Sequence, residues 1–287
     1  MTNLYFCSFA STDILPSLKR IGNEAKKFNL FNRIFLFTEK KLPAYGKKRI
    51  KNIIQISNSK RGFGYWAWKP IIINSVLSKI NENDILIYSD AGNQFNVNGK
   101  DKLLEYIEVA NKHDIWVISL TEDFPDVNWT KADTIKYFID NIVEANKNDE
   151  FHTLIHKGQL ESGTIILKKN DFTQNLLREW ENLMTINNLH LFDDSPSIKK
   201  NIKTFKENRH DQSIFSLLLK ANHFISSPSE LFYSETTEGW KELEKTSPFL
   251  HRRNKKYTIK HFTLCRKILS KIINRINAFI NKVIRNI

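Results

Sequence analysis

The chain has 287 residues, of which 41% are hydrophobic and 12% aromatic, enough to build the core of one large α/β domain. The formal net charge is +13, but residues 251–287 hold eleven basic and no acidic side chains, which leaves 33 basic against 31 acidic in residues 1–250. Such a nearly neutral body argues against a nucleic-acid-binding surface, and no apolar run is long enough to predict a membrane-spanning helix.

Strand-like and helix-like segments alternate along the chain. Apolar runs predict strands at residues 3–9, 33–39, 50–57, 84–90, 114–120 and 162–169. Helical spacing of apolar residues predicts helices at residues 14–30, 69–80, 100–113, 130–139, 170–186 and 211–222. This alternation predicts an α/β fold with a parallel sheet and crossover helices, whose ligands gather at the carboxyl ends of the strands. We expect one domain over residues 1–250, followed by a basic tail over residues 251–287.

The segment DILIYSDAGNQF, residues 84–95, runs from an apolar strand straight into Asp90, Ala91 and Gly92. A carboxylate at a strand end suits a divalent metal or a sugar hydroxyl, and Gly92 lets the backbone approach a ligand. The alternative is an aspartate that only bonds its own turn.

The segment SKRGFGYWAWKP, residues 59–70, places two glycines, basic residues and aromatic residues just before a helix. Tyr65, Trp66 and Trp68 offer flat faces for a base or sugar, while Arg61 and Lys69 can meet phosphate. If the segment is extended, both tryptophans lie on one side and act together. The alternative is a loop filled by core aromatic side chains.

Three further segments bring polar clusters to the ends of predicted elements. WTKAD, residues 129–133, offers Lys131 and Asp133, or else a helix start capped by its threonine. QLESGTIIL, residues 159–167, places Glu161, Ser162 and Gly163 at the start of a strand, where they face a pocket or form a turn. ENRHDQSIFSLL, residues 207–218, crowds Arg209, His210, Asp211 and Gln212 before a helix that Asp211 is also placed to cap.

Taken in order, the motifs RGFGYWAWKP, DILIYSDAG, WTKAD, ESG and RHDQSIFSLL resemble those of bacterial GT-A-type glycosyltransferases of capsule and lipopolysaccharide O-antigen synthesis. The resemblance covers roughly residues 1–235. It implies a Rossmann-like GT-A fold that binds a nucleotide sugar and transfers a hexose, foremost from a UDP-sugar, to a saccharide or lipid-linked glycan acceptor. The alternatives are a sugar-binding homologue without catalysis and a nucleic-acid-binding protein that uses the basic tail.

The resemblance also implies roles for individual residues. SDAG stands where the family has its metal-binding DxD motif, so Asp90 matches the first aspartate and Gly92 replaces the second; Asp90 would then bind Mn²⁺ or Mg²⁺ alone, or hold donor hydroxyls. For catalysis we expect Asp211 first, then Glu161, with Gln212 beside them. The residues expected to bind the donor are Arg61, Tyr65, Trp66, Trp68, Lys69, Asp90, Ala91, Gly92, Lys131, Asp133, Ser162, Gly163 and His210.

Residues 261–287 place apolar side chains on one helical stripe with basic residues largely off it. Such a basic amphipathic helix can lie on an anionic membrane surface, and the alternative is a terminal helix packed on the domain or on a second subunit. The two cysteines, Cys7 and Cys265, lie far apart and favour a reducing compartment. We therefore expect a cytoplasmic protein, peripheral on the inner face of the cell membrane.

Overall fold

A computed structural model describes residues 2–224 and 232–255. The five strands of the main sheet are β1 (Leu4–Phe9), β2 (Arg33–Phe37), β3 (Ile85–Ser89), β5 (Ile115–Ser119) and β6 (Leu160–Lys168). A second, two-stranded sheet pairs β4 (Gln94–Phe95) with β7 (Phe249–Leu250). The predicted amphipathic helix over residues 261–287 lies outside the described residues.

The helices differ widely in length. The longer ones are α1 (Leu15–Lys27), α2 (Ala44–Ser57), α4 (Trp68–Leu77), α5 (Lys100–His113), α7 (Ala132–Phe138), α10 (Asp171–Leu183), α12 (Asp211–Ala221) and α13 (Thr237–Thr246). Single turns form α3 (Gly62–Tyr65), α6 (Asp126–Trp129), α8 (Glu144–Asn146), α9 (Phe151–Leu154) and α11 (Leu189–Phe192). Each helix of the described part is too short or too polar to cross a bilayer.

The main sheet has the strand order β2-β1-β3-β6-β5 and is mixed. β1 pairs in parallel with β2 and β3, whereas β6 runs antiparallel to both β3 and β5. The prediction of an all-parallel sheet is therefore wrong for β6. After β5 the chain stays at the carboxyl edge, where the backbone N–H of Leu120 bonds the carbonyl of Gln159 at 3.0 Å. β6 therefore starts where the other strands end, a reversal that an apolar strand pattern does not encode.

The strand predicted over residues 50–57 is wrong, because those residues form the second half of α2. Ile50 and Ile53, three residues apart on one face of the helix, are buried, whereas Ile56 has turned away from that face and is 65% exposed. The high isoleucine content suggested a strand, but packing against α4 favours the helix.

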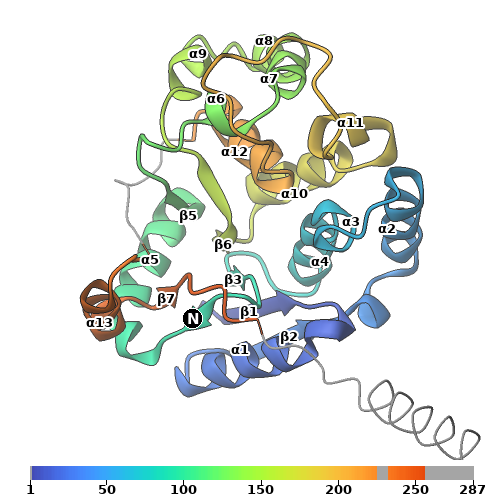
Figure 1. Cartoon of the computed structure of the whole chain (residues 1–287). Helices are drawn as coiled ribbons and strands as arrows, with labels where there is room; N and C mark the ends of the chain where they lie inside the picture. The colour runs from blue at the N-terminus through green and yellow to red at the C-terminus, as the bar shows by residue number, and fades with distance from the viewer. Residues whose placement is uncertain (1, 225–231, 256–287) are drawn as a thin grey trace, which may run out of the picture.

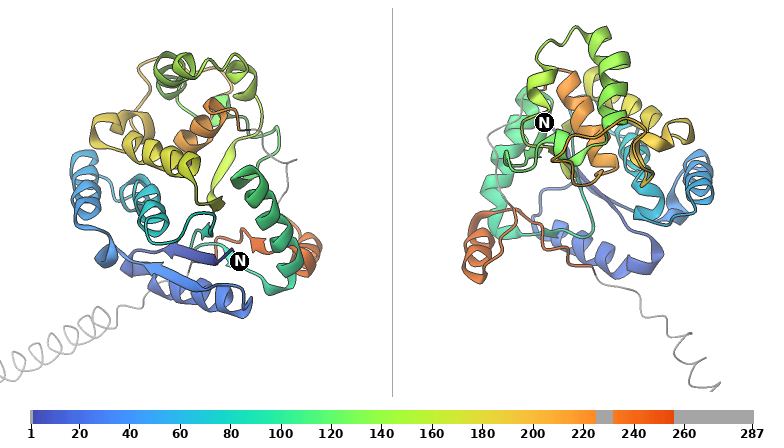
Figure 2. Two further views of the ribbon diagram at one scale, coloured as in Figure 1. Left: turned by 180° about the vertical axis from the view of Figure 1, so that it is seen from behind. Right: turned by 45° about the horizontal axis from the view of Figure 1, so that its top comes forward.

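Helices cover both faces of the sheet (Figures 1 and 2). One core cluster joins α4, α10 and α12 to the face that includes Tyr88 and Ile165. The other joins α1 and α5 to the opposite face, with Ile87 and Ile166. Alternate strand residues point to opposite faces, and β3 is buried on both of them, so it forms the centre of the fold.

Further helices flank this sandwich at its two ends. The helices α6 to α9 gather at one end beside α12, and α13 packs beside α5 at the other (Figure 1). From α13 the chain enters β7, whose pairing with β4 brings the following residues 251–255 back across the carboxyl end of β3.

Candidate functional site

A buried lysine joins three of the predicted motifs at the carboxyl edge of the sheet. Lys69 Nζ lies 2.7 Å from Asp211 Oδ2 and 3.4 Å from Asp90 Oδ1. It also donates to both the Oγ and the carbonyl oxygen of Ser162, each at 3.1 Å. Ser162 Oγ in turn donates to Asp211 Oδ2 at 2.7 Å. Residues far apart in the sequence therefore form one hydrogen-bonded, charged cluster.

The end of a regular element positions each member of this cluster. Asp90 directly follows β3, and its backbone N–H bonds the carbonyl of Gly163 at 2.8 Å. Since β6 is antiparallel, its first residues lie at the edge where β3 ends. Lys69 and Asp211 occupy the first turns of α4 and α12. The α12 dipole favours the negative charge of Asp211, while Lys69, at an unfavourable helix end, depends on its two carboxylates.

Burial and charge together set the protonation of the cluster. Burial raises the pKa of Asp90, and the nearby charge of Asp211 raises it further. The Lys69 ammonium and the hydrogen bond that the Tyr88 hydroxyl donates to Asp90 Oδ1 lower this pKa, but their effect is smaller. Burial alone would lower the pKa of Lys69, but the two carboxylates raise it overall. Burial and Asp90 raise the pKa of Tyr88 well above its ordinary value. Lys69 is therefore a cation and Tyr88 a neutral donor near neutral pH.

Gly163 leaves a space between two carboxylates. A Cβ at this position would lie 3.5 Å from Asp90 Oδ2, and 3.9 Å from both Asn93 Nδ2 and Glu161 Oε2. These are ordinary van der Waals distances, so two carboxylates and an amide lie around the strand backbone at Gly163. Asp90 is the more accessible carboxylate, with 32% of its side chain exposed against 17% for Glu161.

Glu161 has a partner from the other end of the chain. His251 Nδ1 lies 3.2 Å from Glu161 Oε2. Burial alone would raise the pKa of Glu161, but His251, Arg209 and Lys69 outweigh burial and lower it. Burial alone would likewise lower the pKa of His251, but Glu161 raises it overall. The pair thus holds residues 251–255 against the site and keeps Glu161 ionised.

An aromatic wall stands beside the cluster. The His210 ring stacks on Trp66 at 5.5 Å between centroids and lies 5.2 Å from Tyr65. Its Nδ1 contacts the carbonyl oxygen of Phe192 at 2.7 Å, and burial lowers its pKa. His210 is therefore a buried, neutral spacer between Trp66 and the start of α12.

The turn that carries this wall is left-handed, not extended. All five residues from Gly62 to Trp66 have φ between 52° and 87°. This conformation costs about 1–2 kcal/mol for each non-glycine residue, and Gly62 also leaves the room in which the Trp66 ring lies. The two tryptophans are consequently separated. Trp68 is buried, stacks on Phe9 at 3.9 Å and donates its indole N–H to the Gly62 carbonyl at 2.9 Å, so it is a core residue.

Two of the residues expected to bind the donor, Lys131 and Asp133, bond loop residues instead. Lys131 is buried and lies 3.1 Å from Asp193 Oδ1, and it also bonds the carbonyl of His190. Asp133 accepts backbone N–H groups from Ile198 and Lys199, each at 2.7 Å, and these bonds lower its pKa against the raising effect of burial. The WTKAD segment is thus placed to fold the loop after α11, apart from the Lys69 cluster.

Arg61 and Gln212 lie at the margin of the site. Arg61 forms an exposed ion pair with Asp194 at 2.8 Å. Gln212 donates to Gln159 Oε1 at 2.7 Å, which ties the start of α12 to the residue before β6. Ala91 is buried, and its carbonyl accepts a hydrogen bond from Arg20 at 2.8 Å.

Other residues of the site were not predicted from the sequence. Tyr88 was assigned only to a strand, although an alternating pattern would have placed it on the same face as Asp90. Asn93 lies within DILIYSDAGNQF but was given no role, and His251 belongs to no motif; only the tertiary fold brings them to Gly163 and Glu161.

The residues at Asp90 do not fit a divalent metal site. Oδ1 of Asp90 is already occupied by the Tyr88 hydroxyl and lies near the Lys69 ammonium. Gly92, where the second acid would stand, faces the stem of Lys255, with Cγ and Cε each 3.9 Å from the position of a Cβ. Within the described residues no three His, Cys, Asp or Glu side chains form a metal-binding group.

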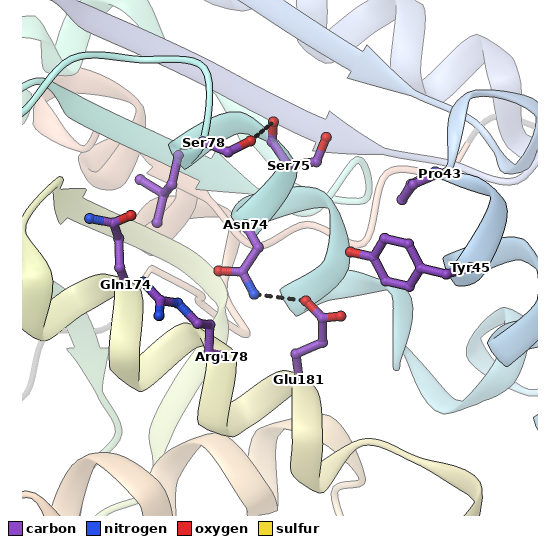
Figure 3. Close-up of a pocket in the computed structure, with 9 residues that line it drawn as sticks. Pro43, Tyr45, Asn74, Ser75, Ser78, Gln174, Arg178 and Glu181 are labelled. Atoms are coloured by element: carbon purple, nitrogen blue, oxygen red, sulfur yellow. Dashed lines mark hydrogen bonds between the residues drawn. The ribbon is translucent and has the colours of Figure 1, made fainter.

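The pocket drawn in Figure 3 lies elsewhere on the molecule. It has a volume of about 480 Å³, and Tyr45, Asn74, Arg178 and Glu181 are among its lining residues, from α2, α4 and α10. Asn74 Nδ2 donates to Glu181 Oε2 at 2.8 Å. Asn74 belongs to the end of α4 remote from Lys69, so this pocket is separate from the charged cluster.

Known proteins give only a structural likeness. No protein-family model and no curated protein matches the chain. Mouse xyloside xylosyltransferase 1 aligns at 7% identity with a TM-score of 0.43, over 87% of this chain and 97% of its own. A glycosyltransferase involved in glycosylation of the PBCV-1 major capsid aligns at 9% identity with a TM-score of 0.38, over 87% of this chain and 94% of its own. Core-mannan synthase A from Aspergillus fumigatus, in a Mn/GDP form, aligns at 13% identity with a TM-score of 0.43, over 77% of this chain and 70% of its own. The chain is thus similar in structure to solved glycosyltransferases. Because the TM-scores are below 0.5, no argument about function is drawn from this similarity.

Proposed function

We propose that the protein is a glycosyltransferase that moves a sugar from a nucleotide-diphosphate donor to a hydroxyl group of a saccharide acceptor. The observation that carries this proposal is the pairing of Asp90 and Asp211 with the Lys69 ammonium, with Glu161 beside Gly163, at the sheet edge where α/β proteins bind ligands. Two of these carboxylates face each other across the open backbone of Gly163. The order of the sequence motifs supports the same function.

The chemistry requires one bond to form and one to break. The acceptor oxygen bonds the anomeric carbon, while the bond from that carbon to the diphosphate breaks and the diphosphate leaves with the electron pair. Glu161 takes the acceptor proton, since its lowered pKa keeps it ionised at neutral pH. Asp90 Oδ2, across Gly163, binds a hydroxyl of the donor sugar.

Asp211 takes a different role from the base expected from the sequence. Only 6% of its side chain is exposed, and its Oδ2 is held by both Lys69 and Ser162. A carboxylate in that position fixes Lys69 and the start of β6 rather than meeting an acceptor. We therefore assign Asp211 and Lys69 as positioning residues and Glu161 as the base.

The finer parts of the proposal rest on the sequence. They are a hexose donor, foremost a UDP-sugar, and an acceptor in cell-surface polysaccharide synthesis, such as a lipid-linked glycan. The basic amphipathic pattern of residues 261–287 supports attachment to an anionic membrane surface, with the protein peripheral on the cytoplasmic face. Flotation with anionic liposomes tests this: equal flotation of the full chain and of a variant ending at residue 255 would contradict it.

A screen of nucleotide sugars identifies the donor. Thermal stability is measured with UDP-, GDP- and CDP-sugars, with and without Mn²⁺, and release of the nucleotide is then followed with candidate acceptors. We expect one nucleotide class to stabilise the protein and to be turned over. Stabilisation by a donor without turnover by any acceptor would favour the sugar-binding alternative, and stabilisation by none would overturn the proposal.

Variants of the two facing carboxylates separate their roles. We expect Glu161→Gln to lower kcat by about 10²–10⁴-fold and to leave the donor Kd within a few-fold. Asp90→Asn should instead weaken donor binding. Glu122→Gln, which changes a carboxylate that is 74% exposed, is the control and should alter neither quantity. A Glu161→Gln variant with wild-type kcat would remove Glu161 as the base.

A further inference from the structure

The segment after β7 lies against the loop that follows β3. The backbone N–H of Asn254 bonds the Gly92 carbonyl at 2.8 Å. Arg20 Nη2 donates to the carbonyls of Ala91 at 2.8 Å, Asn93 at 2.9 Å and Asn254 at 3.2 Å. The guanidinium of Arg20 therefore fastens the chain around residue 254 to the loop that carries Asp90.

This clamp fixes the next side chain over Gly92. The Lys255 stem runs past Gly92, with Cγ and Cε each 3.9 Å from where a Cβ would lie. The ammonium is one bond beyond Cε, and it has no ion-pair partner within residues 2–224 and 232–255. The stem of a cationic side chain therefore lies where a second metal-binding carboxylate would start, and the charge at its end would repel a divalent ion bound beside Gly92.

The charges around the cluster explain why a cation is needed at this place. Lys69 is a single positive charge shared between Asp90 and Asp211, so it leaves nothing to neutralise a diphosphate. His251 is paired with Glu161. Burial lowers the pKa of Arg209, and the nearby charge of Arg253 lowers it further. Arg253 itself is exposed. Residues 251–255 thus bring further positive charge to this edge through Arg253 and Lys255.

We propose that the diphosphate of the donor is bound without a divalent cation, and that the Lys255 ammonium supplies the positive charge that such an ion would bring. This rests on the proposed function, because it concerns the donor of the transferred sugar. A compact ammonium on a flexible stem suits a phosphate group, and the exposed Lys255 side chain starts beside Gly92, two residues from Asp90 in the sequence.

Calorimetry on the full chain tests the proposal with UDP, GDP and CDP, each in EDTA and in Mn²⁺. We expect one diphosphate to bind equally tightly in both conditions. Lys255→Ala should weaken that binding by about 10- to 100-fold, the loss expected for one contact with a charged group. Lys255→Arg, which keeps the charge, should stay within a few-fold, and Lys241→Ala, an exposed lysine on α13, should change nothing.

A second variant tests Gly92 directly. The double variant Gly92→Asp with Lys255→Ala restores the acid and removes the ammonium, and the open space at Gly92 accepts the side chain. We expect Mn²⁺ to strengthen diphosphate binding to this variant, and indifference to Mn²⁺ would count against the proposal.

The outcomes distinguish this proposal from the proposed function. Binding that requires Mn²⁺ in the wild type, or that is unchanged in Lys255→Ala, overturns the role of Lys255 and leaves the glycosyltransferase assignment standing. Failure of every diphosphate to bind in either condition overturns both.

Discussion

The substitution Gly163→Ala separates stability from function at this site. The added methyl group lies 3.5 Å from Asp90 Oδ2, and 3.9 Å from both Asn93 Nδ2 and Glu161 Oε2, so no atom has to move. Gly163 lies inside β6 and lacks a positive φ, so alanine adopts its backbone conformation without strain. Loss of freedom in the unfolded chain should stabilise the protein by about 0.4–1 kcal/mol.

The same methyl group fills the space in which the donor sugar is expected to meet the two carboxylates. A displacement of about 1 Å at a reacting centre costs on the order of 100-fold in rate. We therefore expect kcat/KM for the donor found in the screen to fall about 100-fold, while Tm shifts upward by roughly 1–4 °C. Gly46→Ala, in α2 beside Ile71 and away from the cluster, is the control and should keep wild-type activity. Wild-type kcat/KM in Gly163→Ala, or a fall in Tm of several degrees, would refute the reasoning.

Two further predictions concern the charges of the site. Lys69→Met strands two carboxylates beside an apolar side chain, so the free energy of unfolding in urea should fall by about 3–5 kcal/mol. The exposed Lys51→Met should change it by less than about 0.5 kcal/mol, and an equal effect of both would contradict the assignment. The raised pKa of His251 gives stability that is fully present below its ordinary pKa of 6.5 and is lost as pH rises through the raised value. The lowered pKa of Glu161 gives stability that is present above its ordinary pKa of 4.5 and is lost as pH falls through the lowered value. The stability difference between wild type and His251→Gln should therefore be largest between those two pH values and smaller once the pH exceeds the raised pKa of His251, and an advantage independent of pH would contradict the pairing.

The sequence alone located most of the elements and part of the site. The apolar runs that became β1, β2, β3, β5 and β6 are recognisable because each is a short segment buried on one or both faces. Asp90 could be identified from the sequence as a candidate site residue, because a carboxylate that directly follows a buried strand is expected to bind a cation or a hydrogen-bond donor. Glu161 and Asp211 stood out because polar residues cluster beside apolar elements. Local patterns of this kind record burial, which is a property of each segment.

Direction, pairing and long-range contacts were decided by the tertiary structure. Trp66 and Trp68 look equivalent in the sequence, but the left-handed turn separates a residue of the aromatic wall from a core residue. Lys131 resembles a donor-binding cation, yet it is paired with Asp193, which lies 62 residues further along the chain. The antiparallel direction of β6 carries Glu161 and Gly163 to Asp90, and residues 251–255 complete the site from the far end of the chain. These contacts depend on which surfaces meet after the segments pack, and no local periodicity encodes that information.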